Sequence, residues 1–190
     1  MKLNDLVVVR MGMNLSRGTG KLETSVNPYT YDDMKNDING LYLDSIELAQ
    51  NDLSCNDTYI VNCGNIVFSF VSSSASIVSD INSGKILSQN FAKLLIDQKK
   101  IDSCYLCYCL NESKEMRKQM NISMQGSAIP KLTPAILKGL ELTLPDIGMQ
   151  RLIGKNYFRM KKKQNLMKEE IKLEKQIQLE ILDRLNQINR

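Results

Sequence analysis

The sequence predicts an α+β protein, in which a mixed α/β globular domain over residues 1–146 is followed by one long coiled-coil helix over residues 147–190. Three features support this fold class. Short runs rich in Val, Ile and Phe recur between residues 59 and 96, with turn signals between them. A short helix bounded by proline and glycine begins near residue 134. After residue 154 neither proline nor glycine occurs, and apolar residues recur at steps of three and four.

The first half of the domain is expected to be mostly extended. Residues 3–9, LNDLVVV, predict a strand, or a short helix followed by a strand. The glycine-rich stretch 10–21 predicts a loop, and residues 40–46, GLYLDSI, predict a short strand after several turn signals. Over residues 59–96 we expect several strands, with NCGN and NSGK as turns between them.

The second half of the domain is expected to be mainly helical. Residues 102–122 have apolar residues at helical spacing and predict one helix, capped by Asp102 or Ser103. Thr133 as N-cap, Pro134 as first residue and Gly139 as stop predict a short helix. The alternating stretch 140–145, LELTLP, predicts a strand that leads into the long helix.

The long helix carries an apolar seam of the kind that pairs two helices. Eight of eleven seam positions between residues 153 and 188 are apolar, with Gln164, Glu174 and Gln178 as the exceptions. About 40 residues form a rod of roughly 60 Å, which a domain of roughly 35 Å cannot cover. We therefore expect a second helix from outside the chain; a solvated helix held by Glu–Lys pairs is the alternative. The predicted dimerisation residues are Met160, Met167, Ile171, Ile181, Leu185 and Ile188.

Composition and charge exclude several classes of protein. The chain has no histidine, which excludes Ser-His-Asp and Cys-His catalysis and any histidine metal site. Five cysteines without an export signal predict reduced thiols and a cytoplasmic protein, and no apolar run is long enough to cross a membrane. Residues 150–190 hold 11 Lys and Arg against 5 Asp and Glu, a net charge of +6, which leaves −2 for residues 1–149. The domain is therefore not a general polyanion binder, and DNA binding would require a local basic patch or a partner.

Two stretches suggest chemistry, and each has a simpler interpretation. Cys104, Cys107 and Cys109 are spaced like metal ligands, but no fourth ligand follows, so buried core cysteines are favoured and no metal is expected. The stretch Asn27–Thr30, NPYT, is similar to the adenine-binding motif of amino-methyltransferases. It lacks the second proline, and no glycine-rich cofactor loop follows a strand, so a turn is favoured.

Candidate DNA contacts lie in the predicted loops. Basic side chains there could reach phosphates or guanine edges, the glycines allow close backbone approach, and a glutamine can bond adenine through two hydrogen bonds. The candidates are Arg17, Lys21, Lys85, Gln125 and Lys131.

Taken together, these stretches resemble the target-recognition domain of type I restriction–modification specificity subunits. The resemblance covers nearly the whole chain and rests on an ordered set of loose motifs: KLNDLVVVRMG, the strand-rich stretch 59–96, SCYLCYCLNES, and QGSAIPKLTPAILKGLELTLPDIGMQRLIGK, which leads into a long helix as in that family. Asn65 and Met149 stand where the family usually has Asp and Glu.

The resemblance implies a non-catalytic subunit, without a cofactor, that reads double-stranded DNA and docks methyltransferase and restriction subunits. Family members typically carry two recognition domains and two helices, whereas this sequence has one of each, which implies pairing with a second copy. Two alternatives remain open. One is a coiled-coil adaptor that binds no nucleic acid, which the net charge of the domain favours; the other is a methyltransferase that uses Asn27 to Tyr29.

Overall fold

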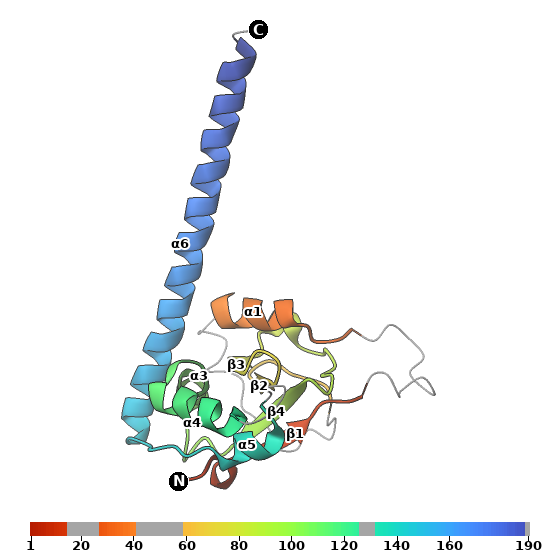
Figure 1. The fold of residues 1–190 in the computed structure, drawn as a ribbon, viewed down its shortest axis with the longest axis vertical. Coiled ribbons are helices and arrows are strands. Elements are labelled where there is room, and N and C mark those ends of the chain that lie inside the picture. The colour runs from red at the N-terminus through yellow and green to blue at the C-terminus, as the bar shows by residue number, and fades with distance from the viewer. Residues whose placement is uncertain (15–26, 41–58, 126–131, 189–190) are drawn as a thin grey trace.

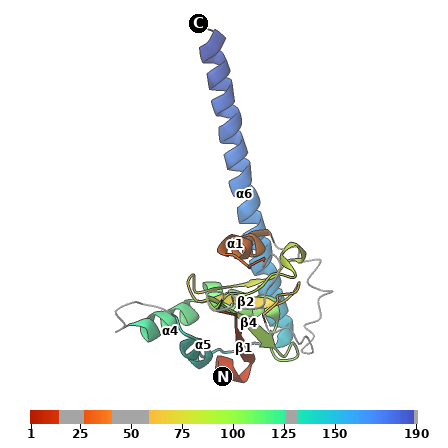
Figure 2. The same ribbon diagram turned by 90° about the vertical axis from the view of Figure 1, so that its right-hand side faces the viewer.

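The structure is a computed structural model that describes residues 1–14, 27–40, 59–125 and 132–188. A globular domain lies beside the lower part of one long helix, which extends far beyond it (Figures 1 and 2). The strands are β1 Val7–Met11, β2 Ile66–Ser69, β3 Ser74–Ile77 and β4 Phe91–Ile96. The α-helices are α1 Tyr31–Gly40, α3 Ser103–Glu112, α4 Lys114–Met124, α5 Pro134–Gly139 and α6 Ile147–Ile188, and two short 3-10 helices span Leu3–Asp5 and Asp80–Asn82.

The four strands form one antiparallel sheet in the order β1-β4-β2-β3. Ile66 of β2 pairs with Leu94 of β4 and with Ile77 of β3, so β2 and β4 are the central strands. All four residues of β2 are buried, as expected for a strand covered on both faces.

Each face of the sheet has its own apolar core. Ile66 and Phe68 point into the larger core, which also contains residues of α3, α4, α5 and the first turns of α6. Val67 points to the opposite face and packs in a smaller core with Tyr29 and Met34 of the α1 region. This alternation follows from the two-residue period of a strand, and it places α1 on the opposite side of the sheet from α4 and α5 (Figure 2).

Much of the predicted organisation is confirmed. The strand-rich stretch contains β2, β3 and β4, and a short 3-10 helix precedes β1. The Asp102 carboxylate accepts a hydrogen bond from Tyr105 N (2.9 Å) at the start of α3, and Thr133 Oγ1 accepts one from Ile136 N (3.3 Å) at the start of α5. Gly64 and Gly84, in the predicted NCGN and NSGK turns, have φ of 83° and 84°, a conformation that glycine adopts without strain.

Three sequence predictions about elements are wrong or lie outside the described residues. Residues 102–122 form two helices rather than one, because Ser113 is extended and its hydroxyl caps α4 through Met116 N (3.4 Å). Residues 140–145 form no strand of the sheet; Glu141 only bridges Lys2, next to the amino terminus. The strand predicted over 40–46 lies outside the described residues after Gly40, the last residue of α1.

α1 is a helix where the sequence predicts only turns. Thr30 Oγ1 accepts a hydrogen bond from Asp33 N (3.1 Å), and the Asp33 carboxylate accepts one from Thr30 N (2.9 Å). This reciprocal arrangement satisfies two amide groups at the start of a helix, and a Thr-x-x-Asp spacing is its sequence signal.

A buried carboxylate connects α1 to the sheet. Asp37 is 1% exposed; its Oδ2 accepts a hydrogen bond from the Tyr29 hydroxyl (2.6 Å), and its Oδ1 accepts from Asn82 Nδ2 (2.8 Å) and Ser79 N (3.2 Å). Burial, followed by the charge of Asp37, raises the pKa of Tyr29, so its hydroxyl remains a donor. The stretch NPYT is therefore part of a structural network around Tyr29.

The variant Asp37→Asn is expected to lower the free energy of unfolding by about 1–2 kcal/mol, because hydrogen bonds to a charged acceptor are stronger than those to an amide. Urea denaturation measures the change. Asp32→Asn is the matched control, since Asp32 is exposed in the first turn of the same helix, and it should cost no more than about 0.5 kcal/mol. Equal effects of the two variants would contradict a structural role for the buried carboxylate.

Candidate functional site

The candidate site is the junction where α6 leaves the domain. The first turns of α6 pack on α3 at very short distance, since a Cβ added to Gly154 would lie 2.5 Å from Tyr105 N and 2.6 Å from Cys104 Cβ. Tyr157 and Phe158 are 4% and 1% exposed and belong to the larger core. The helix therefore starts as a part of the domain and continues as a free rod.

Gln150 holds the start of α6 to the loop that precedes α3. It is 2% exposed; its Oε1 accepts a hydrogen bond from Asp102 N (3.0 Å), and its Nε2 donates to Lys100 O (3.3 Å) and Pro145 O (2.9 Å). Gln150 is also the glutamine of the LTLPDIGMQ stretch on which the family resemblance rests, so this motif has a structural reason. Met149, the neighbour of Gln150 in this stretch, is 45% exposed.

Asn111 joins the sheet to α6. Its Oδ1 accepts a hydrogen bond from Ala75 N (2.7 Å), and its Nδ2 donates to Ala75 O (2.8 Å) and to the Tyr157 hydroxyl (2.9 Å). The side chain therefore occupies the open edge of β3 as a further strand would. Burial raises the pKa of Tyr157, so its hydroxyl stays neutral.

Glu112 lies between two cations at the same junction. Its Oε2 is 2.8 Å from Arg117 Nη2, and its Oε1 is 2.7 Å from Lys161 Nζ on α6. Lys161 Nζ also lies 5.5 Å from the centroid of the Tyr157 ring, within reach of a cation–π contact. The pair Glu112–Lys161 thus fixes α6 one turn beyond Tyr157.

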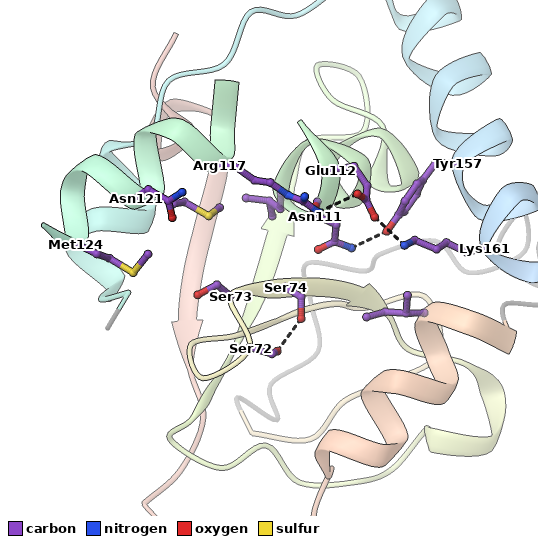
Figure 3. A pocket seen from close by; sticks show the side chains of 13 residues that line it. Ser72, Ser73, Ser74, Asn111, Glu112, Arg117, Asn121, Met124, Tyr157 and Lys161 are labelled. Atoms are coloured by element: carbon purple, nitrogen blue, oxygen red, sulfur yellow. Dashed lines mark hydrogen bonds and ion pairs between the residues drawn. The ribbon is translucent and has the colours of Figure 1, made fainter. Parts of the chain in front are cut away.

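These side chains surround a pocket of about 390 Å³ between the β2–β3 turn, the α3–α4 break and α6 (Figure 3). Its lining includes the polar side chains Ser72, Ser74, Asn121 and Glu112, and Met120 and Met124 contribute apolar surface. Sequence reasoning does not identify this pocket, because its residues come from five separate parts of the chain: α1, the β2–β3 turn, α3, α4 and α6. The contacts of Gln150, Asn111 and Glu112 support rigid attachment of α6 to the domain.

The cysteine cluster is part of the core. Cys104, Cys107 and Cys109 are buried on α3, and burial raises the pKa of Cys104 to about 12 and that of Cys109 to about 11. These thiols are protonated at neutral pH, whereas a metal takes the thiolate. Within residues 1–14, 27–40, 59–125 and 132–188, no three His, Cys, Asp or Glu side chains are grouped so that they could hold a metal ion.

Two of the five candidate DNA contacts lie among the described residues. Lys85 Nζ is 2.7 Å from Asp33 Oδ1 and donates to Asn82 Oδ1 (2.8 Å), and its side chain is 15% exposed. Gln125 is exposed at the carboxyl end of α4. The structure records no contact between these two residues, and Arg17, Lys21 and Lys131 lie outside the described residues.

Beyond the junction, α6 exposes a long apolar face. Ile153 and Tyr157, the first two positions of the predicted seam, pack on the domain. The following positions are open to solvent: Met160, Met167, Ile171, Ile181 and Leu185 are between 43% and 63% exposed. Ile188 lies in the last turn of the helix.

A second apolar stripe runs along α6 beside the predicted seam. Leu166, Leu173 and Ile177 are 55–58% exposed and follow each other at steps of seven and four. With 3.6 residues per turn, the second stripe lies roughly 100° from the face that Gly154 and Phe158 turn to the domain, and the seam lies roughly 150° from that face on the other side. The apolar face is therefore wider than one helix–helix seam and points away from the domain. No helix among the described residues is long and apolar enough to cross a membrane.

Comparison with protein-family models matches residues 1–183 to the type I restriction modification DNA specificity domain. The search of curated proteins finds no match.

Solved structures share the fold at low sequence identity. An HsdS subunit from Thermoanaerobacter tengcongensis matches 88% of this chain and 38% of its own, with a TM-score of 0.52 and 16% identity. A structure described for complex assembly and conformational transition of the type I R-M system matches 96% of this chain and 42% of its own, with a TM-score of 0.58 and 16% identity. The type I restriction-modification S subunit from M. genitalium matches 82% of this chain and 37% of its own, with a TM-score of 0.50 and 14% identity. The chain thus spans about two-fifths of the length of these structures.

Proposed function

Because the chain belongs to the type I restriction–modification DNA specificity family, we propose that it is a non-catalytic subunit that reads one half of a bipartite double-stranded DNA site. In this proposal residues 1–146 recognise bases and residues 147–190 pair with the same helix of a second copy, in the cytoplasm. The methyltransferase and restriction subunits that join the complex carry out the chemistry.

The wide exposed apolar face of α6 is the observation that carries this proposal. An isolated helix does not keep so many large apolar side chains in water, since burying each one contributes about 1.5–3 kcal/mol. The predicted seam from Met160 to Ile188 suits pairing with a second copy, because a two-fold axis brings the same seam of both copies together. The second stripe, Leu166, Leu173 and Ile177, remains available for the methyltransferase subunit.

Rigid attachment of α6 supports a role in setting the distance between half-sites. Gly154, Gln150 and the Glu112–Lys161 pair hold one face of the helix to the domain over about three turns, so pairing of two helices would fix the spacing and orientation of two domains. Two identical domains related by a two-fold axis would read an inverted repeat.

The test is selection from a random duplex library by the chain together with its methyltransferase subunit. The expected result is enrichment of an inverted repeat with one spacer length. A chain that assembles with partners but enriches no sequence would instead be the coiled-coil adaptor, which the net charge of −2 over residues 1–149 favours. Binding of S-adenosylmethionine by the chain alone in calorimetry would contradict the non-catalytic assignment.

Arg17, Lys21, Lys85, Gln125 and Lys131 are proposed to contact the DNA. Alanine at a base-reading residue should cost about 1–3 kcal/mol of binding free energy and relax the specificity at one base position. Alanine at a phosphate contact should weaken binding to all DNA sequences alike. Lys85→Ala also removes the ion pair with Asp33, so its stability is measured beside its affinity. The loop assignment is wrong when none of the five changes binding.

A further inference from the structure

A row of lysines continues the domain-facing side of α6 into the free part of the rod. Residues seven apart on a helix lie almost above one another, so Lys168 and Lys175 are in line with Gly154 and Lys161. Lys172 is fourteen residues beyond the buried Phe158, so it lies nearly above Phe158, on the line next to that of Gly154 and Lys161. We define Lys168, Lys172 and Lys175 as the lysine row.

In this part of α6 the lysines of the row lie together on one face of the helix. Lys168 and Lys172 are i,i+4 neighbours and Lys172 and Lys175 are i,i+3 neighbours, so like charges adjoin at a cost of a few tenths of a kcal/mol for each pair. The three side chains are exposed, and no ion pair within the described part of the chain includes them.

The glutamates of the same segment do not neutralise the row. By helical phase, Glu170 and Glu174 lie on the opposite half of the helix. Glu169 lies on the same half as the row and accepts a hydrogen bond from Asn165 (3.1 Å), so one carboxylate faces three ammonium groups and the row keeps a net positive charge. Such an arrangement is typical of a surface that meets an anion.

We propose that the lysine row binds the phosphate backbone of the DNA spacer between the two half-sites, without regard to its sequence. The inference rests on the proposed function. The domain lies on one side of α6 (Figure 1), and by helical phase the lysine row points to that same side. A duplex that runs from one domain to the other would therefore pass the row, whereas a second helix on the apolar face would leave it uncovered.

The dimensions of the row suit a phosphate backbone. Lys168 and Lys175 are separated by about 10 Å along the helix, and successive phosphates of one strand advance about 3.4 Å along the duplex axis. Flexible ammonium groups at this spacing can neutralise two or three phosphates and contribute to affinity but not to base discrimination.

The experiment compares two double variants in the complex with the methyltransferase subunit. K168Q/K172Q removes an i,i+4 pair of charges from the row, and K114Q/K118Q removes an i,i+4 pair of exposed lysines from α4, outside the long helix. Affinity for the selected bipartite duplex is measured against salt concentration. K168Q/K172Q should bind roughly tenfold more weakly at 0.1 M salt, and its log–log salt slope should be shallower by about 1–2, since each lost phosphate contact removes about 0.9. K114Q/K118Q should match the unmodified chain.

A shorter duplex and a scrambled spacer complete the test. On a duplex that ends at one half-site, K168Q/K172Q should have the same affinity and salt slope as the unmodified chain. Scrambling the spacer sequence should change neither the affinity nor the slope of any variant. Equal slopes for the two variants on the bipartite duplex would overturn the inference and leave the proposed function intact. K168Q/K172Q could instead fail to assemble with the methyltransferase subunit while the salt slope of DNA binding stays unchanged. That result would overturn the inference and would show that the row binds an acidic protein surface. When the unmodified chain enriches no sequence, the proposed function itself has failed, and the inference with it.

Discussion

Truncation after Lys163 is expected to turn a dimer into a monomer that keeps its folded domain. The cut removes Met167, Ile171, Ile181 and Leu185, which form most of the exposed seam of α6, together with the predicted seam residue Ile188. It retains the turns from Gln150 to Lys161 that pack on α3, so the domain core and the Glu112–Lys161 ion pair remain. Multi-angle light scattering measures the mass, and far-UV circular dichroism shows that the domain is intact.

Point variants separate loss of the pairing face from loss of the rod. I171D/I181D places two charges in the seam and should give the monomer at full length, because an unpaired charge in an apolar interface is costly to bury. L179D is the matched control, since Leu179 is 51% exposed but points to the domain side of the helix by its helical phase. A truncated chain that is still a dimer would show that α6 is not the dimer interface.

The elements that could be predicted from sequence are those whose signal is local. Thr133, Pro134 and Gly139 determine α5 by capping and by the missing amide of proline, and the apolar repeat after residue 154 identifies α6. The predictions that are wrong concern segments whose structure is determined by contacts with residues distant in sequence. Residues 140–145 alternate like a strand, but Leu142 N is bonded to Met1 O (2.8 Å) and the sheet edge is elsewhere.

The candidate site shows the same division. The exposed seam of α6 follows from its spacing, whereas the partners of Lys85 and Asn111 come from residues far along the chain. Nothing local to Lys85 indicates that its ammonium is 2.7 Å from Asp33, and nothing near Asn111 indicates a bond to Tyr157. The second apolar stripe, Leu166, Leu173 and Ile177, has a signal in the sequence, but a two-stranded heptad template does not include it.

Gly154 is the position at which a single added side chain should be most damaging. Glycine inside a helix is about 1 kcal/mol less favourable than alanine, so local propensity alone predicts a gain on substitution. The packing predicts the opposite, because a Cβ at this position would lie 2.5–2.7 Å from backbone atoms of Tyr105 and Cys104, and backbone cannot move aside without displacing α3. A distance of this size is well inside van der Waals contact.

Gly154→Val is expected to lower the free energy of unfolding by about 3 kcal/mol or more, at the upper end of overpacking, and Gly154→Ala should lower it by less. Urea denaturation measures both. Gly139→Ala is the control, since no atom lies within 4 Å of the Cβ it would add, and its effect should be within about 0.5 kcal/mol. Because the same contact orients α6, the valine variant should also lose more affinity for the bipartite duplex than for a duplex with one half-site. A stable Gly154→Val protein with normal spacer preference would mean that α6 is not held to the domain through this contact.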